Sequence, residues 1–194
     1  MREEGGSLLK AKAKKTSILM VTGVYFPEIN GAVLQCMHII SVLRNNFHFS
    51  ILTGTKNKKL LKNKSFEGVP IFRILIYKYK FLYFFQIISI IFFLVRNRAS
   101  FDIIHLHGFS SKSALIILIS KLIRKKIIIK LTSFGHDDPE TIKNKGKILY
   151  FLYLCADCYI GVSPVFKNSY LKLNLDLKKY HSIPNGVNTK IFCP

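Results

Sequence analysis

The chain has 194 residues, 49% of them hydrophobic, which is enough to bury the core of one domain and excludes disorder over most of its length. Thirty Lys and Arg against 10 Asp and Glu give a net charge of +20, which favours a polyanionic partner: nucleic acid, anionic lipid or a phosphorylated small molecule. Much of this charge lies in Lys-Asn runs such as Lys56–Lys64, for which a solvated surface loop is the alternative.

The ends of the chain and its cysteines bear on the compartment. Residues 1–16 are acidic and then basic and lack the apolar stretch of a secretory signal, so they predict a basic flexible tail on a cytoplasmic protein. Cys155 and Cys158 form a C-x-x-C pair, but no second pair at zinc spacing accompanies them. A buried, reduced structural pair is favoured over a redox or zinc site, and no metal is expected.

Short runs of Ile, Leu and Val recur along the chain and predict strands, several of them apolar throughout, as in strands covered on both faces. They are Ile18–Val21, Phe49–Leu52, Val69–Ile74, Ile103–Leu106, Ile127–Leu131, Cys158–Val162 and Tyr180–Ile183. Helices are predicted between them, at Val33–Leu43 and near residues 80–97, 111–123, 140–155 and 164–174. The alternation predicts one Rossmann-like, doubly wound α/β domain with a parallel sheet, whose ligands bind beyond the carboxyl ends of the strands.

The longest apolar run, Phe81–Val95, is shorter than the roughly 20 residues that a bilayer-spanning helix needs. We interpret it first as a buried core helix. Its basic flanks, which include Arg96 and Arg98, leave a helix that lies in a membrane interface as the alternative, with the protein peripheral at the inner face of the membrane.

Several segments at the ends of the predicted strands carry candidate functional residues. Gly31 lies at the start of the first predicted helix, where unpaired N–H groups and the helix dipole suit a phosphate, although a plain turn or cap is the alternative. His105 and His107 lie two apart on a predicted strand and therefore share a face. With His136 and Asp137 they are possible metal ligands, but hydrogen bonding of His107 to a polar substrate is favoured, and simple capping of the strand is the alternative. Ser163 precedes Pro164, a good helix start with the hydroxyl as cap.

Taken in order, four segments resemble the N-terminal domain of the GT-B fold glycosyltransferases of the family 4 type. The family's Tyr-x-Pro stretch and Gly-Gly pair correspond to Tyr25–Pro27 and Asn30-Gly31. Its D-hydrophobic-hydrophobic-H-x-H-G segment corresponds to Asp102–Gly108, and its Ala-Asp strand with Val-Ser corresponds to Ala156–Ser163. Its I-P-N-G-V-D-x-x-x-F segment corresponds to Ile183–Phe192, so that the resemblance covers Thr16 to Pro194.

This resemblance implies transfer of a sugar from a nucleotide-diphosphate donor to an acceptor hydroxyl, usually with retention and without a metal or other cofactor. It places Asn30 and Gly31 near the donor diphosphate and His107 near the donor sugar, which His107 would orient. His136, Asp137 and Ser163 are candidate substrate-binding residues. Asn30 replaces the first glycine of the usual pair, and a left-handed conformation of Asn30 would preserve close approach of the phosphate.

The same resemblance divides the chain into an acceptor-side domain, residues 17–185, and the start of an interdomain hinge, residues 186–194. The family keeps its donor-binding Arg and Lys and its paired Glu in a C-terminal domain without a counterpart in this sequence. We therefore expect little transfer by this chain alone, and a partner half on a missing segment or a separate chain. The acceptor is expected to be a glycan or glycolipid.

Two other functions compete. A basic module that binds nucleic acid or a membrane surface without catalysis would use the charge of +20, but no recognition-helix, RRM-type or zinc-finger signature is present, so nucleic acid is disfavoured. A Rossmann-type dinucleotide enzyme would need the Gly-rich fingerprint and an acidic residue about 20 positions later, and the sequence lacks both.

Overall fold

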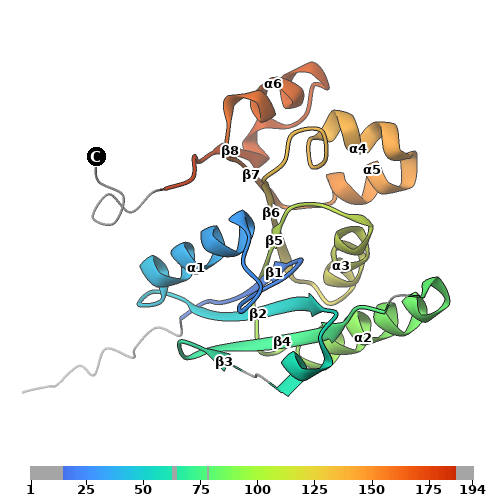
Figure 1. Ribbon diagram of the computed structural model, residues 1–194. Coiled ribbons are helices and arrows are strands. Elements are labelled where there is room, and N and C mark those ends of the chain that lie inside the picture. The colour runs from blue at the N-terminus through green and yellow to red at the C-terminus, as the bar shows by residue number, and fades with distance from the viewer. Residues whose placement is uncertain (1–14, 63–64, 78, 187–194) are drawn as a thin grey trace, which may run out of the picture.

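The computed structural model describes residues 15–62, 65–77 and 79–186, which form one α/β domain (Figure 1). An eight-stranded sheet with the order β3-β4-β2-β1-β5-β6-β7-β8 lies between layers of helices. Most of the predicted tail and hinge, together with Cys193, lie outside the described residues.

The strands confirm the predicted apolar runs and the parallel sheet. They are β1 (Ser17–Thr22), β2 (His48–Thr55), β4 (Val69–Leu75), β5 (Ile103–His107), β6 (Lys126–Leu131), β7 (Cys158–Gly161) and β8 (Tyr180–Ser182), all in parallel register. The short β3 (Ser65–Phe66) pairs antiparallel with β4 and was not predicted. Glu67 and Gly68, both at positive φ, make the tight turn between these two strands, and a strand of two residues leaves no periodicity to read.

The helices also lie where they were predicted, with one exception. They are α1 (Gly31–Leu43), α2 (Tyr83–Arg96), α3 (Ser111–Leu122), α4 (Pro139–Lys145), α5 (Lys147–Leu154) and α6 (Pro164–Lys172), with 3-10 turns η1 (Lys58–Lys62), η2 (Lys80–Leu82) and η3 (Leu177–Lys179). The prediction of one helix near residues 140–155 is wrong. Gly146, with φ of 139°, leaves the helical region and separates α4 from α5.

Two hydrophobic cores lie on opposite faces of the sheet. On one face α1 packs Val33 and Cys36 against Met20 of β1 and Ile51 of β2. On the other face α2, α3, α5 and α6 pack against side chains that alternate with these, such as Leu19. The chain adds β2 and β4 on one side of β1 and then returns to add β5 to β8 on the other, so that the strand order reverses at β1.

Helix α2 is apolar around most of its circumference and only half of it is in the core. Gln86, Ile90 and Leu94 are buried, whereas Phe84 and Phe92 are 63% and 62% exposed. This helix therefore serves as a core helix along one side and presents aromatic side chains on the other. In the described part of the chain, no helix has the length and apolar character needed to cross a membrane.

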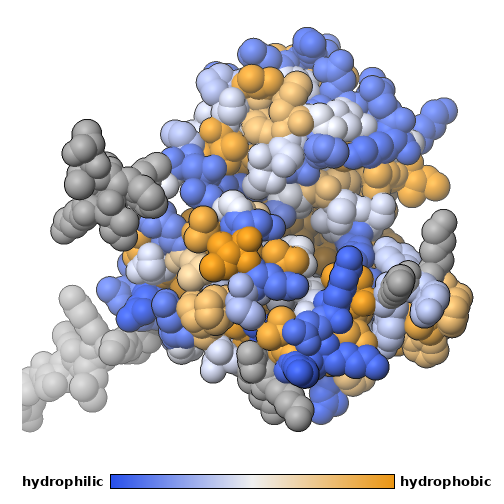
Figure 2. Space-filling view, in the orientation of Figure 1, coloured by the Kyte–Doolittle hydropathy of each residue, from blue (hydrophilic) through white to orange (hydrophobic). Residues whose placement is uncertain are grey.

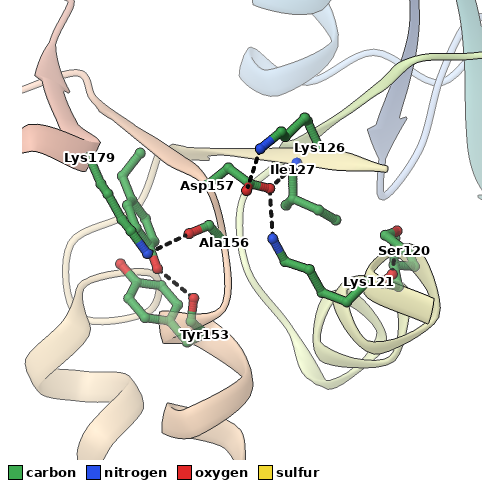
Figure 3. A network of polar contacts seen from close by, with 10 residues as sticks. Ser120, Lys121, Lys126, Ile127, Tyr153, Ala156, Asp157 and Lys179 are labelled. Atoms are coloured by element: carbon green, nitrogen blue, oxygen red, sulfur yellow. Dashed lines mark hydrogen bonds and ion pairs between the residues drawn. The ribbon is translucent and has the colours of Figure 1, made fainter. Parts of the chain in front are cut away.

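Asp157, which directly precedes β7, joins three elements of the domain (Figure 3). Its carboxylate accepts hydrogen bonds from Lys121 Nζ at the end of α3 and from the backbone N–H of Ile127 in β6, both at 2.8 Å, and it lies 3.5 Å from Lys126 Nζ. Burial alone would raise the pKa of this carboxyl, but the Lys121 ammonium and the Ile127 N–H outweigh burial and hold the pKa below its ordinary value. The Ala-Asp pair of the sequence is thus a structural connection.

Asp157→Asn is expected to lower the free energy of unfolding at pH 7 by about 1–3 kcal/mol, because it removes hydrogen bonds to a charged group. The folded pKa lies below the unfolded one, so the contribution of Asp157 is complete above about pH 4 and is lost as the pH falls through the folded pKa. Urea unfolding of both proteins at pH 7 and pH 3 measures this. Asp176→Asn, at an exposed turn, serves as control. A difference that stays the same at both pH values would contradict the assignment.

Candidate functional site

The carboxyl ends of β1 and β5 lie side by side at the point where the strand order reverses (Figure 1). In doubly wound sheets, loops on either side of such a point diverge and leave a crevice in which ligands bind. A cavity of about 260 Å³ occupies this place, on the side of the sheet that α2 and α3 cover. Its wall includes Gly23 after β1, Gly54 in β2 and the segment from His107 to Ser110 after β5.

Asp137 shapes the rim of this crevice. Its carboxylate accepts hydrogen bonds from the backbone N–H groups of Phe109, Thr132 and Ser133 at 2.9–3.0 Å and from the Thr132 hydroxyl at 2.9 Å. The loops after β5 and β6 are therefore held together by one buried side chain. Gly108 lies between them at φ of 86°, which explains the glycine of the His-x-His-Gly segment. A contact of Asp137 with substrate stays a prediction.

The side chains of His105 and His107 lie on the opposite side of β5 from Leu106, which belongs to the core beneath α2 and α3. His107, the last residue of β5, also contributes to the wall of the cavity at the strand end. Their rings are 4.7 Å apart. Burial lowers the pKa of His105 to about 4, and burial together with His105 and Lys130 holds the pKa of His107 well below its ordinary value. Nε2 of His105 and both ring nitrogens of His107 are buried without a hydrogen-bond partner among the described residues. Two neutral imidazoles therefore lie at this strand end.

Lys130 of β6 pairs in register with His107 and lies on the same side of the sheet. It is only 5% exposed, and none of the described carboxylates forms an ion pair with it. Burial lowers its pKa, while the Cys36 thiol of α1 opposes that shift. Lys130 was not predicted as a site residue, because a single lysine in the run KIIIKL does not change the pattern of a buried strand. Because no described carboxylate neutralises this buried lysine, the α1 side of the sheet is suited to an anion.

Asn30 and Gly31 form the start of α1. The Asn30 side-chain oxygen accepts a hydrogen bond of 3.0 Å from the backbone N–H of Val33, and its φ of −146° is extended. The left-handed conformation considered for Asn30 is therefore not adopted. A Cβ atom added to Gly31 would have no protein atom within 4 Å. No contact within the described structure demands this glycine, so the space beside it is open to a ligand.

His136 and Ser163 do not line the cavity. His136 is exposed in the loop after β6, where its carbonyl oxygen accepts a hydrogen bond from Lys145. The prediction that the Ser163 hydroxyl caps α6 is wrong. The N–H of Phe166 instead bonds to the Ser163 carbonyl oxygen at 3.2 Å, and Pro164 has no N–H to offer. The substrate-binding roles of both residues stay predictions.

The possible metal ligands and the C-x-x-C pair can be compared with the structure. Within the described ranges, no group of three or more His, Cys, Asp or Glu side chains is placed to hold a metal ion. Cys155 at the end of α5 and Cys158 at the start of β7 are free thiols, half-buried rather than fully buried.

Comparison with known proteins agrees with this geometry. The sequence profile of Glycosyltransferase Family 4 matches residues 29–191. Anabaena HepE in complex with UDP and glucose is similar in structure, with a TM-score of 0.61 and 14% identity over 91% of this chain and 46% of HepE. The lipopolysaccharide outer core galactosyltransferase WaaB has a TM-score of 0.60 and 14% identity over 89% of this chain and 46% of WaaB. UDP-N-acetylglucosamine 2-epimerase from Rickettsia bellii has a TM-score of 0.62 and 11% identity over 89% of this chain and 45% of the epimerase.

The fold and the strand-end crevice therefore define a GT-B type N-terminal domain, and the chain belongs to glycosyltransferase family 4. At these low identities the likeness to solved structures concerns the fold alone. The chain spans just under half the length of those structures. A search of curated proteins found no match.

The two histidines are expected to make the domain less stable in mild acid. Their folded pKa values lie below the unfolded value of about 6.5, so the unfolded chain binds more protons and stability is lost as the pH falls from 6.5 towards 4. Each histidine contributes up to about 1.4 kcal/mol per pH unit in that range. Urea unfolding between pH 7 and pH 4.5 measures the slope. His105→Leu should flatten it, whereas His48→Leu, at an exposed site, should not. Titration of the His105 and His107 imidazole resonances near pH 6.5 would contradict this prediction.

Proposed function

We propose that this domain is part of an enzyme that transfers a sugar from a nucleotide-diphosphate donor to an acceptor hydroxyl, with retention of configuration. The observation that carries the proposal is the family match over residues 29–191 on a domain whose crevice lies at the strand-order reversal. The complex of HepE with UDP and glucose and the galactosyltransferase WaaB support it, because both have a similarly folded half.

The α1 side of the crevice is suited to the donor. As the sugar leaves, negative charge develops on the diphosphate, and fixed dipoles and cations near it lower the barrier. The start of α1, left open at Gly31, offers backbone N–H groups and the positive end of the helix dipole. Lys130 supplies a positive charge on the same side of the sheet, and no carboxylate of the described residues forms an ion pair with it. His107 is neutral, so it can hydrogen-bond a sugar hydroxyl without repelling the developing positive charge of the sugar ring.

The acceptor would enter from the side of the sheet that α2 and α3 cover. The remaining donor contacts would come from a second GT-B domain. We propose that this second domain lies on a further segment of the protein or on a separate chain, because the described domain corresponds to just under half of HepE and WaaB. Transfer by the domain alone is expected to be slow.

With its second domain present, the His107→Ala enzyme is expected to transfer sugar about a hundredfold more slowly, because an oriented hydrogen bond at the donor sugar is lost. Initial rates with UDP-glucose and UDP-galactose as donors measure this, together with thermal unfolding to verify the fold. His48→Ala is the matched control, because His48 begins β2 and therefore lies at the amino ends of the strands, away from the site at their carboxyl ends. Near wild-type turnover by His107→Ala would remove His107 from the site.

The exposed side of α2 supports a peripheral position at a membrane. Its apolar stripe follows helical spacing and consists of Phe84, Phe85, Ile88, Phe92 and Val95, and the exposed Phe81 of η2 extends it. A shallow hollow beside it also includes Arg96 and Arg98, and Arg96 lies 5.8 Å above the Phe92 ring. Hydrophobic side chains reach the surface at the lower right, where α2 runs (Figures 1 and 2). Aromatic side chains beside arginines match the boundary between acyl chains and anionic headgroups.

Vesicles of phosphatidylglycerol are expected to bind the protein, and the double variant Phe84→Asp/Phe92→Asp should bind at least tenfold more weakly, because both side chains are exposed and lie on the apolar stripe. Sedimentation with vesicles measures this. Leu34→Asp on α1, 54% exposed on the opposite face of the sheet, is the matched control. If the vesicles do not bind while duplex DNA binds with a steep dependence on salt, the membrane assignment fails and a nucleic-acid-binding function gains.

A further inference from the structure

Gln86 is a polar side chain that folding alone does not explain. It lies in the first turn of α2, in the sequence YFFQIISIIFFLVR, on the side that also carries the buried Ile90 and Leu94. It is 3% exposed and lines the cavity at the strand-order reversal, and its amide has no hydrogen-bond partner among the described residues. The amide is not among the fully buried polar atoms that lack a partner, so it meets the cavity, and an apolar residue at this position would suit the core equally well.

Lys112 lies across the cavity from α2, in the first turn of α3, and it also lines the wall. Its Nζ atom is 5.9 Å from the centre of the Tyr83 ring at the start of α2. None of the ion pairs in the described part of the chain involves it. The acidic side chain at the cavity, Asp137, is already saturated by the loops after β5 and β6. Lys112 is therefore a cation that is free to meet a ligand.

The rest of the wall combines apolar side chains, such as Leu52 and Ile116, with small hydroxyl-bearing ones, such as Thr53, so that Gln86 and Lys112 supply the amide and the ammonium of a mixed lining. Its volume of about 260 Å³ is near the lower limit of ligand pockets, which suits a single ring rather than a nucleotide. Apolar walls with a few convergent polar groups are typical of sites for small ligands.

We propose that this cavity is an acceptor subsite that binds one sugar ring bearing an anionic group, with the Gln86 amide bonding ring hydroxyls and the Lys112 ammonium bonding the anion. The inference rests on the proposed transfer reaction and names its acceptor class. The donor is assigned to the α1 side of β5, and the cavity opens on the α2 side, so the two substrates meet at the end of β5 from opposite faces. Phosphate and carboxylate share the required charge.

Titration of the isotopically labelled chain with glucose 1-phosphate, glucuronate and glucose tests this by NMR. The side-chain amide signal of Gln86 should shift, and one or both anionic probes should bind about tenfold more tightly than glucose, since a charge-assisted hydrogen bond is added. The comparison of the two anions identifies phosphate or carboxylate as the group.

Lys112→Gln should remove the preference for the anionic probes and leave glucose binding unchanged. Gln86→Leu should weaken all three probes about tenfold without lowering the thermal unfolding midpoint, because the amide has no partner to lose. Lys167→Gln, an exposed lysine on α6, is the control for charge. Equal binding of glucose and both anions, unchanged binding by Lys112→Gln, or destabilisation by Gln86→Leu would overturn the proposal.

The outcome is separable from that of the proposed function. Sugar transfer without probe binding in the cavity would overturn the subsite and leave the transferase intact. Probe binding in a protein that uses no nucleotide sugar would establish a cavity for anionic sugars, but it would overturn the transferase and with it the role of the cavity as an acceptor subsite.

Discussion

Strands β1 and β5 lie side by side although β2, β4 and α2 separate them along the chain. Asp102 secures the beginning of this pairing, because its side chain accepts a hydrogen bond of 2.9 Å from the Ser17 N–H and its own N–H bonds to the Ser17 carbonyl. The loops at the other end then diverge to opposite sides of the sheet. The cavity, the histidines and the open start of α1 all lie at that end, so the candidate site depends on this one register.

The alternation of side chains along β5 separates two chemical environments. Leu106 faces the cavity side, whereas His105 and His107 face Lys130 and α1. One side therefore concentrates positive potential without a described counter-ion, and the other combines apolar side chains with hydroxyls, an amide and an ammonium.

The sequence determined most of the architecture. Continuous Ile, Leu and Val runs require strands buried on both faces, and the helical patterns between them require parallel crossovers, so the sheet follows from local periodicity. The order of motifs from Tyr25 to Phe192 was also sufficient to indicate the family. Among the helices, the break at Gly146 was not predicted, because one glycine within a helical pattern is compatible with both a continuous and a broken helix.

Only the tertiary structure decided what individual polar residues do. Asp137 and Asp157 stand in the sequence as parts of motifs, but partners distant in sequence occupy their carboxylates and make them structural. Gln86 and Lys130 were not distinguished at all, since one polar residue hardly alters the pattern of an apolar helix or strand. Periodicity is a local property that a sequence displays directly. Whether a polar group has a partner depends on contacts across the fold, which no local pattern contains.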